Sequence, residues 1–184
     1  MTMVAEAKML RWAAAMVDVR KGRRAAVAKI GPLVEQSRIH LNGIPETAWR
    51  DPYLVGFMLT LITIVARIES RTLQDRDLSV VQSQAWSAIT DMDADLIGED
   101  ALTLSTSHPQ EFQYGCHRAT IVASRLCGTA AVASIGYEPW QDAVPTDEHP
   151  VDGDERAAIS YPVTGNWADA FDAYIAALPS VRLC

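Results

Sequence analysis

The stretch that decides the fold is DPYLVGFMLTLITIVARIESRTLQ, residues 51–74. Asp51 can accept hydrogen bonds from the first backbone N–H groups of a helix, and Pro52 suits a first helical position because its missing N–H costs nothing there. From Tyr53 to Ala66 nearly every residue is apolar, and the few polar residues share one narrow strip. Because a helix that is apolar on most of its circumference is surrounded by others, the pattern predicts a central helix over about 52–74.

The same apolar stretch is too short to cross a bilayer. A membrane-spanning helix needs about 20 predominantly apolar residues, whereas Tyr53–Ala66 is 14 residues long and contains Thr60 and Thr63. We therefore expect the buried helix of a soluble protein and no membrane partner. The opening residues MTMVAEAKMLRW mix charged with apolar side chains and lack the pattern of a secretory signal. Three irregularly spaced cysteines fit the reducing cytoplasm, where we expect the protein to reside.

Helices are also predicted before the central one. The apolar residues Met9, Trp12, Met16 and Val19 recur at helical spacing, which indicates an amphipathic helix of about five turns. Gly22 is expected to interrupt or end this helix. A short second helix is predicted from Pro32 to about residue 41, with Asn-Gly at 42–43 as its stop.

Three further helices are predicted after the central one. Asp77 is expected to cap a helix that ends near Gly98. A helix from residue 110 or 111 to about 134 carries small residues that would allow close approach to the central helix. The last helix is predicted to begin at Asn166, and its apolar stripe is Trp167, Phe171, Tyr174 and Leu178.

These elements predict an all-α fold in one domain, residues 1–184. A content of 49% hydrophobic and 21% charged residues is typical of a globular chain, and 184 residues suit a single core. We expect a bundle of five to six helices around the central helix. A long irregular acidic arm, about 136–165, would precede the last helix, because this stretch contains four prolines.

Charge is distributed unevenly along the chain. Residues 1–30 hold seven basic and two acidic side chains, a net charge of +5. Because the net charge of the whole chain is −7, the remaining residues carry −12. The basic run RKGRR comprises Arg20, Lys21, Arg23 and Arg24. Such a run can bind nucleic-acid phosphates. No aromatic platform accompanies it, however, and the acidic remainder of the chain would repel a polyanion. We therefore expect either an ordinary solvated helix end or a charge-complementary contact with the acidic segment, in the same subunit or in a partner.

The acidic arm is the second candidate for interaction. Between Glu138 and Glu155 it has seven acidic residues and no Lys or Arg. Tyr137 and Trp140 are aromatic side chains that could anchor it to the bundle or to a second subunit. A freely moving loop is the alternative interpretation.

Residues for catalysis or ligand binding are weakly indicated. Cys116 and His117 are adjacent, so on a helix their side chains point about 100° apart and do not form a dyad. Arg67 and Arg71 continue the polar strip of the central helix and could face a carboxylate or phosphate, although a structural salt bridge is the simpler interpretation. The spacings typical of zinc ligands do not occur, and we expect neither a metal nor a cofactor.

The leading hypothesis is a protein-interaction or regulatory helical module without an evident catalytic constellation, acting as a homodimer or with another protein. The alternative is a small-molecule binder or enzyme whose pocket lies between the central and fifth helices and uses Arg67, Arg71, His117 and Cys116. Nucleic-acid binding through the basic N-terminal segment is the third hypothesis. The sequence contains no recognised enzyme motif, so catalysis is not the expected function.

Overall fold

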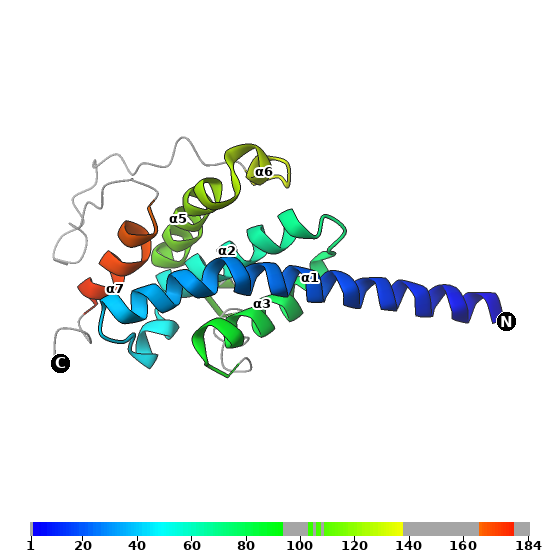
Figure 1. The fold of residues 1–184 in the computed structure, drawn as a ribbon, viewed down its shortest axis with the longest axis horizontal. Helices are drawn as coiled ribbons and strands as arrows, with labels where there is room; N and C mark the ends of the chain where they lie inside the picture. Colours follow the sequence, from blue (N-terminus) through cyan, green and yellow to red (C-terminus); the bar gives the residue numbers. More distant parts are fainter. Residues whose placement is uncertain (1, 94–102, 105, 108, 138–165, 179–184) are drawn as a thin grey trace.

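The computed structural model describes residues 2–93, 103–104, 106–107, 109–137 and 166–178, and it describes side chains from Trp12 onwards (Figure 1). Within these ranges the chain forms helices joined by short turns and no strand, as the sequence predicts. The helices are α1 (Thr2–His40), η1 (Glu46–Arg50), α2 (Pro52–Glu69), α3 (Asp75–Thr90), α5 (Gln110–Cys127), α6 (Thr129–Ala133), η3 (Ala168–Asp172) and α7 (Ala173–Ala177).

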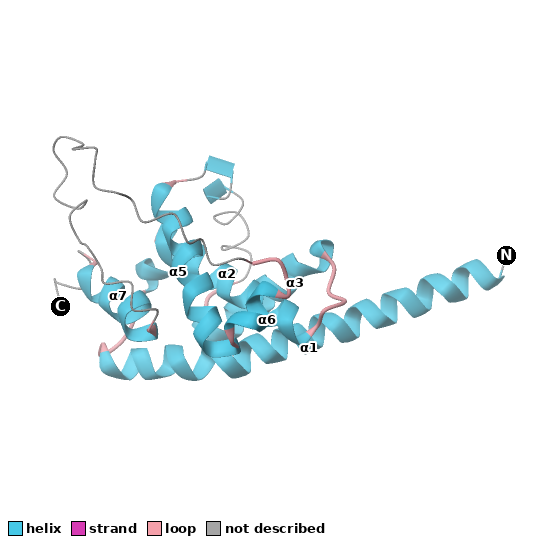
Figure 2. Ribbon diagram, turned by 90° about the horizontal axis from the view of Figure 1, so that it is seen from above, coloured by secondary structure: helices cyan, strands magenta, loops and turns pink. Residues whose placement is uncertain are grey.

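α2 is the central helix, which confirms the main expectation. The other long helices, α1, α3 and α5, all contact it (Figure 2). Phe57, Leu61 and Ile64 are completely buried. By length and composition α2 could also cross a membrane, but 67% of it is buried inside the fold, as is usual for a core helix. The helix ends at Glu69 rather than near residue 74, because the chain leaves the helical conformation at Ser70.

The predicted helix start at Asp51 is also confirmed. The carboxylate accepts hydrogen bonds from the backbone N–H groups of Tyr53 at 2.9 Å and Leu54 at 3.4 Å. It also accepts a bond of 2.8 Å from the hydroxyl of Tyr174, in α7. The cap therefore joins the start of the central helix to the last helix of the bundle.

The division of the N-terminal region into two helices is wrong. α1 is continuous from Thr2 to His40 and includes both Gly22 and Pro32. Gly22 is buried, and a Cβ there would lie 3.1 Å from the Cβ of Ala66, so the glycine serves close packing on α2 rather than termination. Pro32 lies on the exposed face, where water can satisfy the carbonyl that loses its N–H partner.

α3 differs from the prediction at both ends. It begins at Asp75 rather than Asp77, and it ends at Thr90, well before Gly98. Asp91 adopts a left-handed conformation with φ +64°, which ends the helix. The guanidinium of Arg38, in α1, donates to the backbone carbonyls of Ile89 at 3.2 Å and Thr90 at 2.9 Å, so the end is fixed by a neighbouring helix.

α5 begins at Gln110 and packs against α2, as expected. It does not continue to residue 134, because the chain breaks at Gly128 with φ +90° and starts again as α6. A Cβ on Gly115 would lie 2.9 Å from the backbone nitrogen of Phe57, and one on Gly56 would lie 3.1 Å from the backbone carbon of Phe112. Two facing glycines thus allow the backbones of α2 and α5 to touch.

The C-terminal segment docks through aromatic rings, in agreement with its predicted apolar stripe. Phe171 is fully buried, and its ring centroid lies 4.5 Å from that of Trp167 and 6.0 Å from that of Phe57. The indole N–H of Trp167 donates to the hydroxyl of Ser37, in α1, at 2.8 Å. The segment begins with a π-helical turn, Ala168–Asp172, before α7, and the acidic arm at 138–165 lies outside the described residues.

Candidate interaction surface on the first helix

The N-terminal part of α1 extends beyond the other helices. Figures 1 and 2, viewed at right angles, both show its first turns projecting from the body of the bundle. The sequence predicts Trp12 as part of an apolar packing stripe, but Trp12 is 66% exposed. Val17, which is not part of that stripe, is 62% exposed. Only from Val19 onwards does the stripe enter the core. No described residue therefore covers the N-terminal end of the expected packing face.

Contacts with the turn after α2 hold α1 at the point where it leaves the bundle. The carboxylate of Asp18 accepts hydrogen bonds of 2.8 Å from the hydroxyls of both Ser70 and Thr72. One turn further on, Gly22 packs against Ala66. The projecting turns therefore start from a rigid base.

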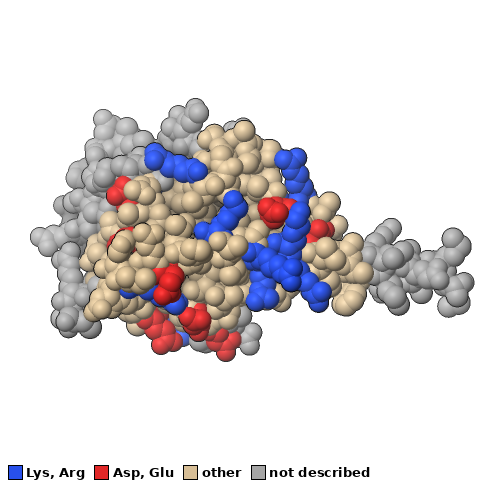
Figure 3. Space-filling view, viewed as in Figure 1, with Lys and Arg blue, Asp and Glu red and all other residues tan. Residues whose placement is uncertain are grey.

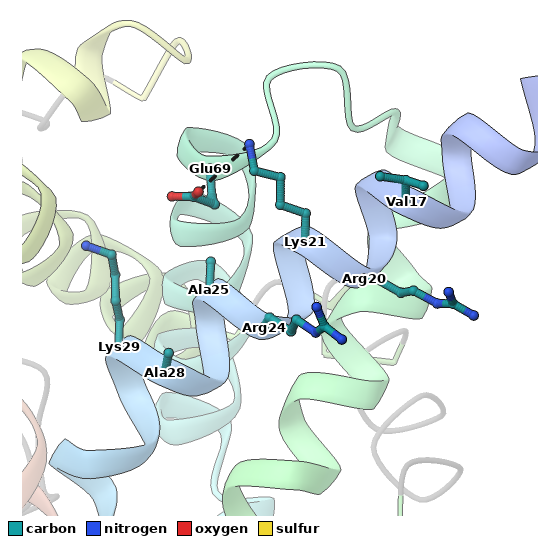
Figure 4. A pocket seen from close by; sticks show the side chains of 8 residues that line it. All are labelled: Val17, Arg20, Lys21, Arg24, Ala25, Ala28, Lys29 and Glu69. Carbon is teal, nitrogen blue, oxygen red and sulfur yellow. Dashed lines mark ion pairs between the residues drawn. The ribbon is translucent and has the colours of Figure 1, made fainter.

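A groove of about 630 Å³ runs along the exposed side of α1 next to this base (Figure 4). Its lining residues are Val17, Arg20, Lys21, Arg24, Ala25, Ala28, Lys29 and Glu69. Except for Glu69 of α2, they all belong to one face of α1, because they recur at intervals of three and four residues. Small apolar residues form the floor, and long cationic side chains surround it.

The groove is electropositive. Four of its lining residues are cationic, and Glu69 is the only acidic one. Lys21 lies 3.8 Å from the Glu69 carboxylate, and both side chains are about half exposed, so this ion pair contributes little to stability. Lys and Arg side chains gather over this part of α1 in Figure 3, and few acidic side chains lie among them. Of the basic residues predicted to mediate contacts, Arg20, Lys21 and Arg24 line the groove; Arg23 is exposed but does not line it.

A second cluster lies between α2 and the segment after α6. Arg67 forms an ion pair with Asp75, and its Nε atom is buried without a hydrogen-bond acceptor among the described residues. The thiol of Cys116 donates to the carbonyl of Gly56 at 3.6 Å. Burial raises the pKa of Tyr137. The positive charge of Arg67 lowers this pKa, whereas Cys116 and Asp75 raise it further. Three predicted residues, Arg67, Cys116 and Tyr137, are thus close neighbours.

The remaining predicted residues do not share this cluster. His117 is half-buried, and its pKa is lowered by burial and by the charge of Arg118, not of Arg67. Arg71 is exposed in the turn that follows α2, so it does not continue the polar strip of that helix. Trp140 lies outside the described residues. In the part of the chain that the structure describes, no group of three His, Cys, Asp or Glu side chains could hold a metal ion.

Burial also raises the pKa of both described thiols, Cys116 and Cys127. A raised pKa disfavours the thiolate, which is the nucleophilic form. Cys116 additionally has Thr60 as a hydrogen-bonding neighbour, which works against the rise. The geometry therefore favours structural thiols over reactive ones.

Arg118 is the residue that the sequence analysis missed. It is only 1% exposed, although it lies next to the predicted polar residue His117. The available signal was its position three residues after Gly115 and four before Val122, which places it at the edge of the packing face of α5. A basic residue at the edge of such a face is ordinarily assigned to solvent.

Comparison of the chain with protein-family models, with curated proteins and with solved structures finds no match.

Proposed function

We propose that the protein is a helical interaction module that self-associates, with the exposed side of α1 in one copy binding the acidic surface of a second copy. The observations that support this most directly are the projecting end of α1, where Trp12 is 66% exposed, and the cationic groove further along α1, where the lining residue Val17 is 62% exposed. Large exposed apolar side chains next to charged ones are typical of protein contacts, and tryptophan and arginine are enriched at their energetic centres.

Charge complementarity favours a second copy as the partner. Residues 1–30 carry a net charge of +5, and the rest of the chain carries −12. In a symmetric pair each copy would present its basic helix to the acidic part of the other, so the favourable contact would occur twice. Seven acidic residues between Glu138 and Glu155, with Trp140 among them, provide a matching acidic and aromatic stretch.

The test is the mass of the full-length protein in solution, measured by light scattering over a range of concentration and salt. The proposal predicts twice the chain mass at low ionic strength and dissociation as salt rises, because exposed charges are screened. The double variant Lys21→Glu/Arg24→Glu should raise the dissociation constant at least tenfold, and Trp12→Ser should raise it roughly tenfold to a hundredfold.

Matched controls distinguish this surface from general effects of charge and apolar area. Arg50→Glu reverses an exposed charge at the other end of the bundle, and Ile39→Ser removes an apolar side chain that is 72% exposed. Neither should change the dissociation constant. A monomer at every concentration, or equal effects of test and control variants, would contradict the proposal.

Nucleic-acid binding is the other outcome that the same cations allow. If the protein stays monomeric and binds single- or double-stranded DNA with an affinity that falls steeply with salt, the groove is a phosphate-binding surface instead. The proposal predicts no such binding at physiological salt, because the net charge of the chain is −7.

A further inference from the structure

The exposed face of α1 continues past the groove towards the end of the helix. Its exposed residues recur at intervals of three and four positions, and they include Lys21, Arg24, Ala28, Pro32 and Glu35. Figure 2 shows α1 along one edge of the molecule, with the other helices on one side of it. No described helix therefore stands between this face and a partner.

The two halves of the face carry opposite charge. The groove holds the cations, whereas from Gly31 to the end of α1 the chain has a single Lys or Arg, Arg38. Arg38 is shared by two carboxylates, at 3.5 Å from Glu35 and 3.0 Å from Asp91, and these are 62% and 79% exposed. Figure 3 accordingly shows basic side chains over the middle of α1 and acidic ones towards its C-terminal end. This end is thus an acidic surface made of described residues.

Small residues form the middle of the face. Ala25 and Ala28 make the floor of the groove (Figure 4). At Gly31, nothing beyond the adjacent residues and the local helix backbone would lie within 4 Å of an added Cβ. The distance between two packed helix axes depends on the side chains at the contact, so small ones allow a close approach. The groove can therefore receive another helix.

We infer that α1 of the second copy occupies the groove, running antiparallel and crossing at Ala28. The inference rests on the self-association proposed above and names the surfaces that meet. Lys21 lies seven residues before Ala28, and Glu35 lies seven residues after it. A two-fold axis at Ala28 therefore brings Lys21 of each copy opposite Glu35 of the other. A parallel pair would place the cations of the two grooves against each other, which is unfavourable.

The crossing limits which residues take part. Helices in globular proteins commonly cross at about 50°, so their axes separate with distance from the crossing point. Ile39 lies eleven residues after Ala28 and falls outside the contact, which is why its substitution serves as a control. Trp12 lies sixteen residues before Ala28, past the point where α1 of the second copy ends, so Trp12 would meet other elements of that copy.

Disulfide cross-linking of the full-length protein tests the position of the axis. A residue on a two-fold axis lies next to its own copy, and a disulfide needs two Cα atoms about 4–7 Å apart. Under mild oxidation, Ala28→Cys should form a covalent dimer roughly tenfold faster than Arg23→Cys, followed on non-reducing gels. Arg23→Cys places its thiol on the exposed surface of the same helix but outside the groove. The natural sequence measures the background from its three cysteines.

Charge exchange tests the pairing across the axis. Lys21→Glu and Glu35→Lys should each raise the dissociation constant about tenfold, because each brings like charges together twice in the dimer. Lys21→Glu/Glu35→Lys restores opposite charges and the natural net charge, so its dissociation constant should return to within about threefold of the natural value. Glu111→Lys, which reverses an exposed charge on α5, should leave the dissociation constant unchanged. Circular dichroism in dilute protein checks that every variant folds.

The inference requires both the cross-link at residue 28 and the restoration by the double variant. A dimer that Lys21→Glu weakens, but that lacks either of these results, overturns the antiparallel crossing and leaves self-association through the groove standing. A monomer at every concentration overturns both. Equal effects of Glu35→Lys and Glu111→Lys would also overturn the crossing, because the acidic end of α1 would then be no special contact.

Discussion

α2 and the projecting turns of α1 are both rich in apolar residues, yet the fold buries only the first. Phe57 and Leu61 of α2 are completely buried, whereas Trp12 and Val17 of α1 are more than half exposed. The difference lies in what each helix meets. α2 contacts three long helices, one of them through facing glycines, whereas the first turns of α1 extend past the end of the bundle (Figure 1).

This comparison shows that apolar content does not decide burial by itself. A helix face is buried when other elements of the same chain reach it, and the described elements do not extend along α1 beyond the contacts at Asp18. A partner can use such an uncovered apolar face, and the cationic groove further along the same helix adds a charged surface. Substitutions in the covered and in the uncovered region should therefore differ in their effect on stability.

The two tryptophans Trp86 and Trp12 give the largest expected difference. Trp86, in α3, is fully buried, and its ring centroid lies 6.2 Å from that of Trp49. Trp86→Ala should lower the free energy of unfolding by about 3–5 kcal/mol, because it leaves a large cavity. Trp12→Ala should change it by less than about 0.5 kcal/mol in dilute protein. Urea unfolding followed by circular dichroism measures both.

If Trp12→Ala lowers the free energy of unfolding by more than expected, measurements at high and low protein concentration distinguish the two possible causes. If the variant is destabilised only at high concentration, the loss belongs to association between copies, since binding stabilises the folded state by mass action. A loss of several kcal/mol in dilute monomer would show instead that the end of α1 packs on its own chain, and the contrast between the two helices would disappear.

Gly115→Ala tests the close approach of α5 to α2. The new Cβ would meet backbone atoms of Tyr53 and Phe57, which cannot move aside as a flexible side chain would. We expect the free energy of unfolding to fall by roughly 3 kcal/mol. Gly31→Ala in α1 is the matched control, because nothing beyond the adjacent residues and the local helix backbone lies within 4 Å of the added methyl group. It should stabilise by about 0.5–1 kcal/mol through helix propensity, and equal effects of the two variants would argue against tight contact.

Asp51→Ala tests the cap that links α2 to α7. It removes the acceptor for the first N–H groups of α2 and for the hydroxyl of Tyr174, so we expect a loss of about 2 kcal/mol in urea unfolding. Asp51→Asn keeps an acceptor oxygen and should cost about half as much. In a double-mutant cycle, Tyr174→Phe should cost less in the Asp51→Ala background than in the natural sequence, because the bond is already lost. If the two losses of free energy of unfolding simply add, the contribution of the Tyr174 hydroxyl to stability does not depend on Asp51.

Much of the core could be predicted from the sequence because its signals are local. The Asp51-Pro52 start, the apolar run after it and the small residues of α5 each impose their consequence on neighbouring residues or on one helix face. The helix ends were predicted less well, because tertiary contacts decide them. Gly22 is kept helical by packing on Ala66, and α3 ends where Arg38 binds its last carbonyls.

The candidate surfaces were predicted only in part for the same reason. The basic run could be recognised from its composition, and Arg20, Lys21 and Arg24 do line a groove. Whether the apolar stripe beside it is covered depends on how far other helices extend, and periodicity carries no information about that. The burial of Arg118 likewise depends on packing across the bundle and not on its neighbours in sequence.

His117 gives the smallest and most specific effect. Burial, together with the charge of Arg118, lowers its pKa below the ordinary value of 6.5. The folded protein therefore holds this proton less tightly than the unfolded chain does. The contribution of the neutral imidazole to stability is complete above the unfolded-state pKa, and it is lost as the pH falls through the lower pKa of the folded state.

The expected result is that the natural sequence loses more stability than His117→Gln when the pH falls from neutral to mildly acidic. Urea unfolding at several pH values measures the difference, and an NMR titration of the imidazole gives the folded pKa directly. His40→Gln, which removes an exposed histidine at the end of α1, is the control variant. Identical slopes for the natural sequence and His117→Gln would mean that neither burial nor the charge of Arg118 lowers the pKa of His117 in the folded protein.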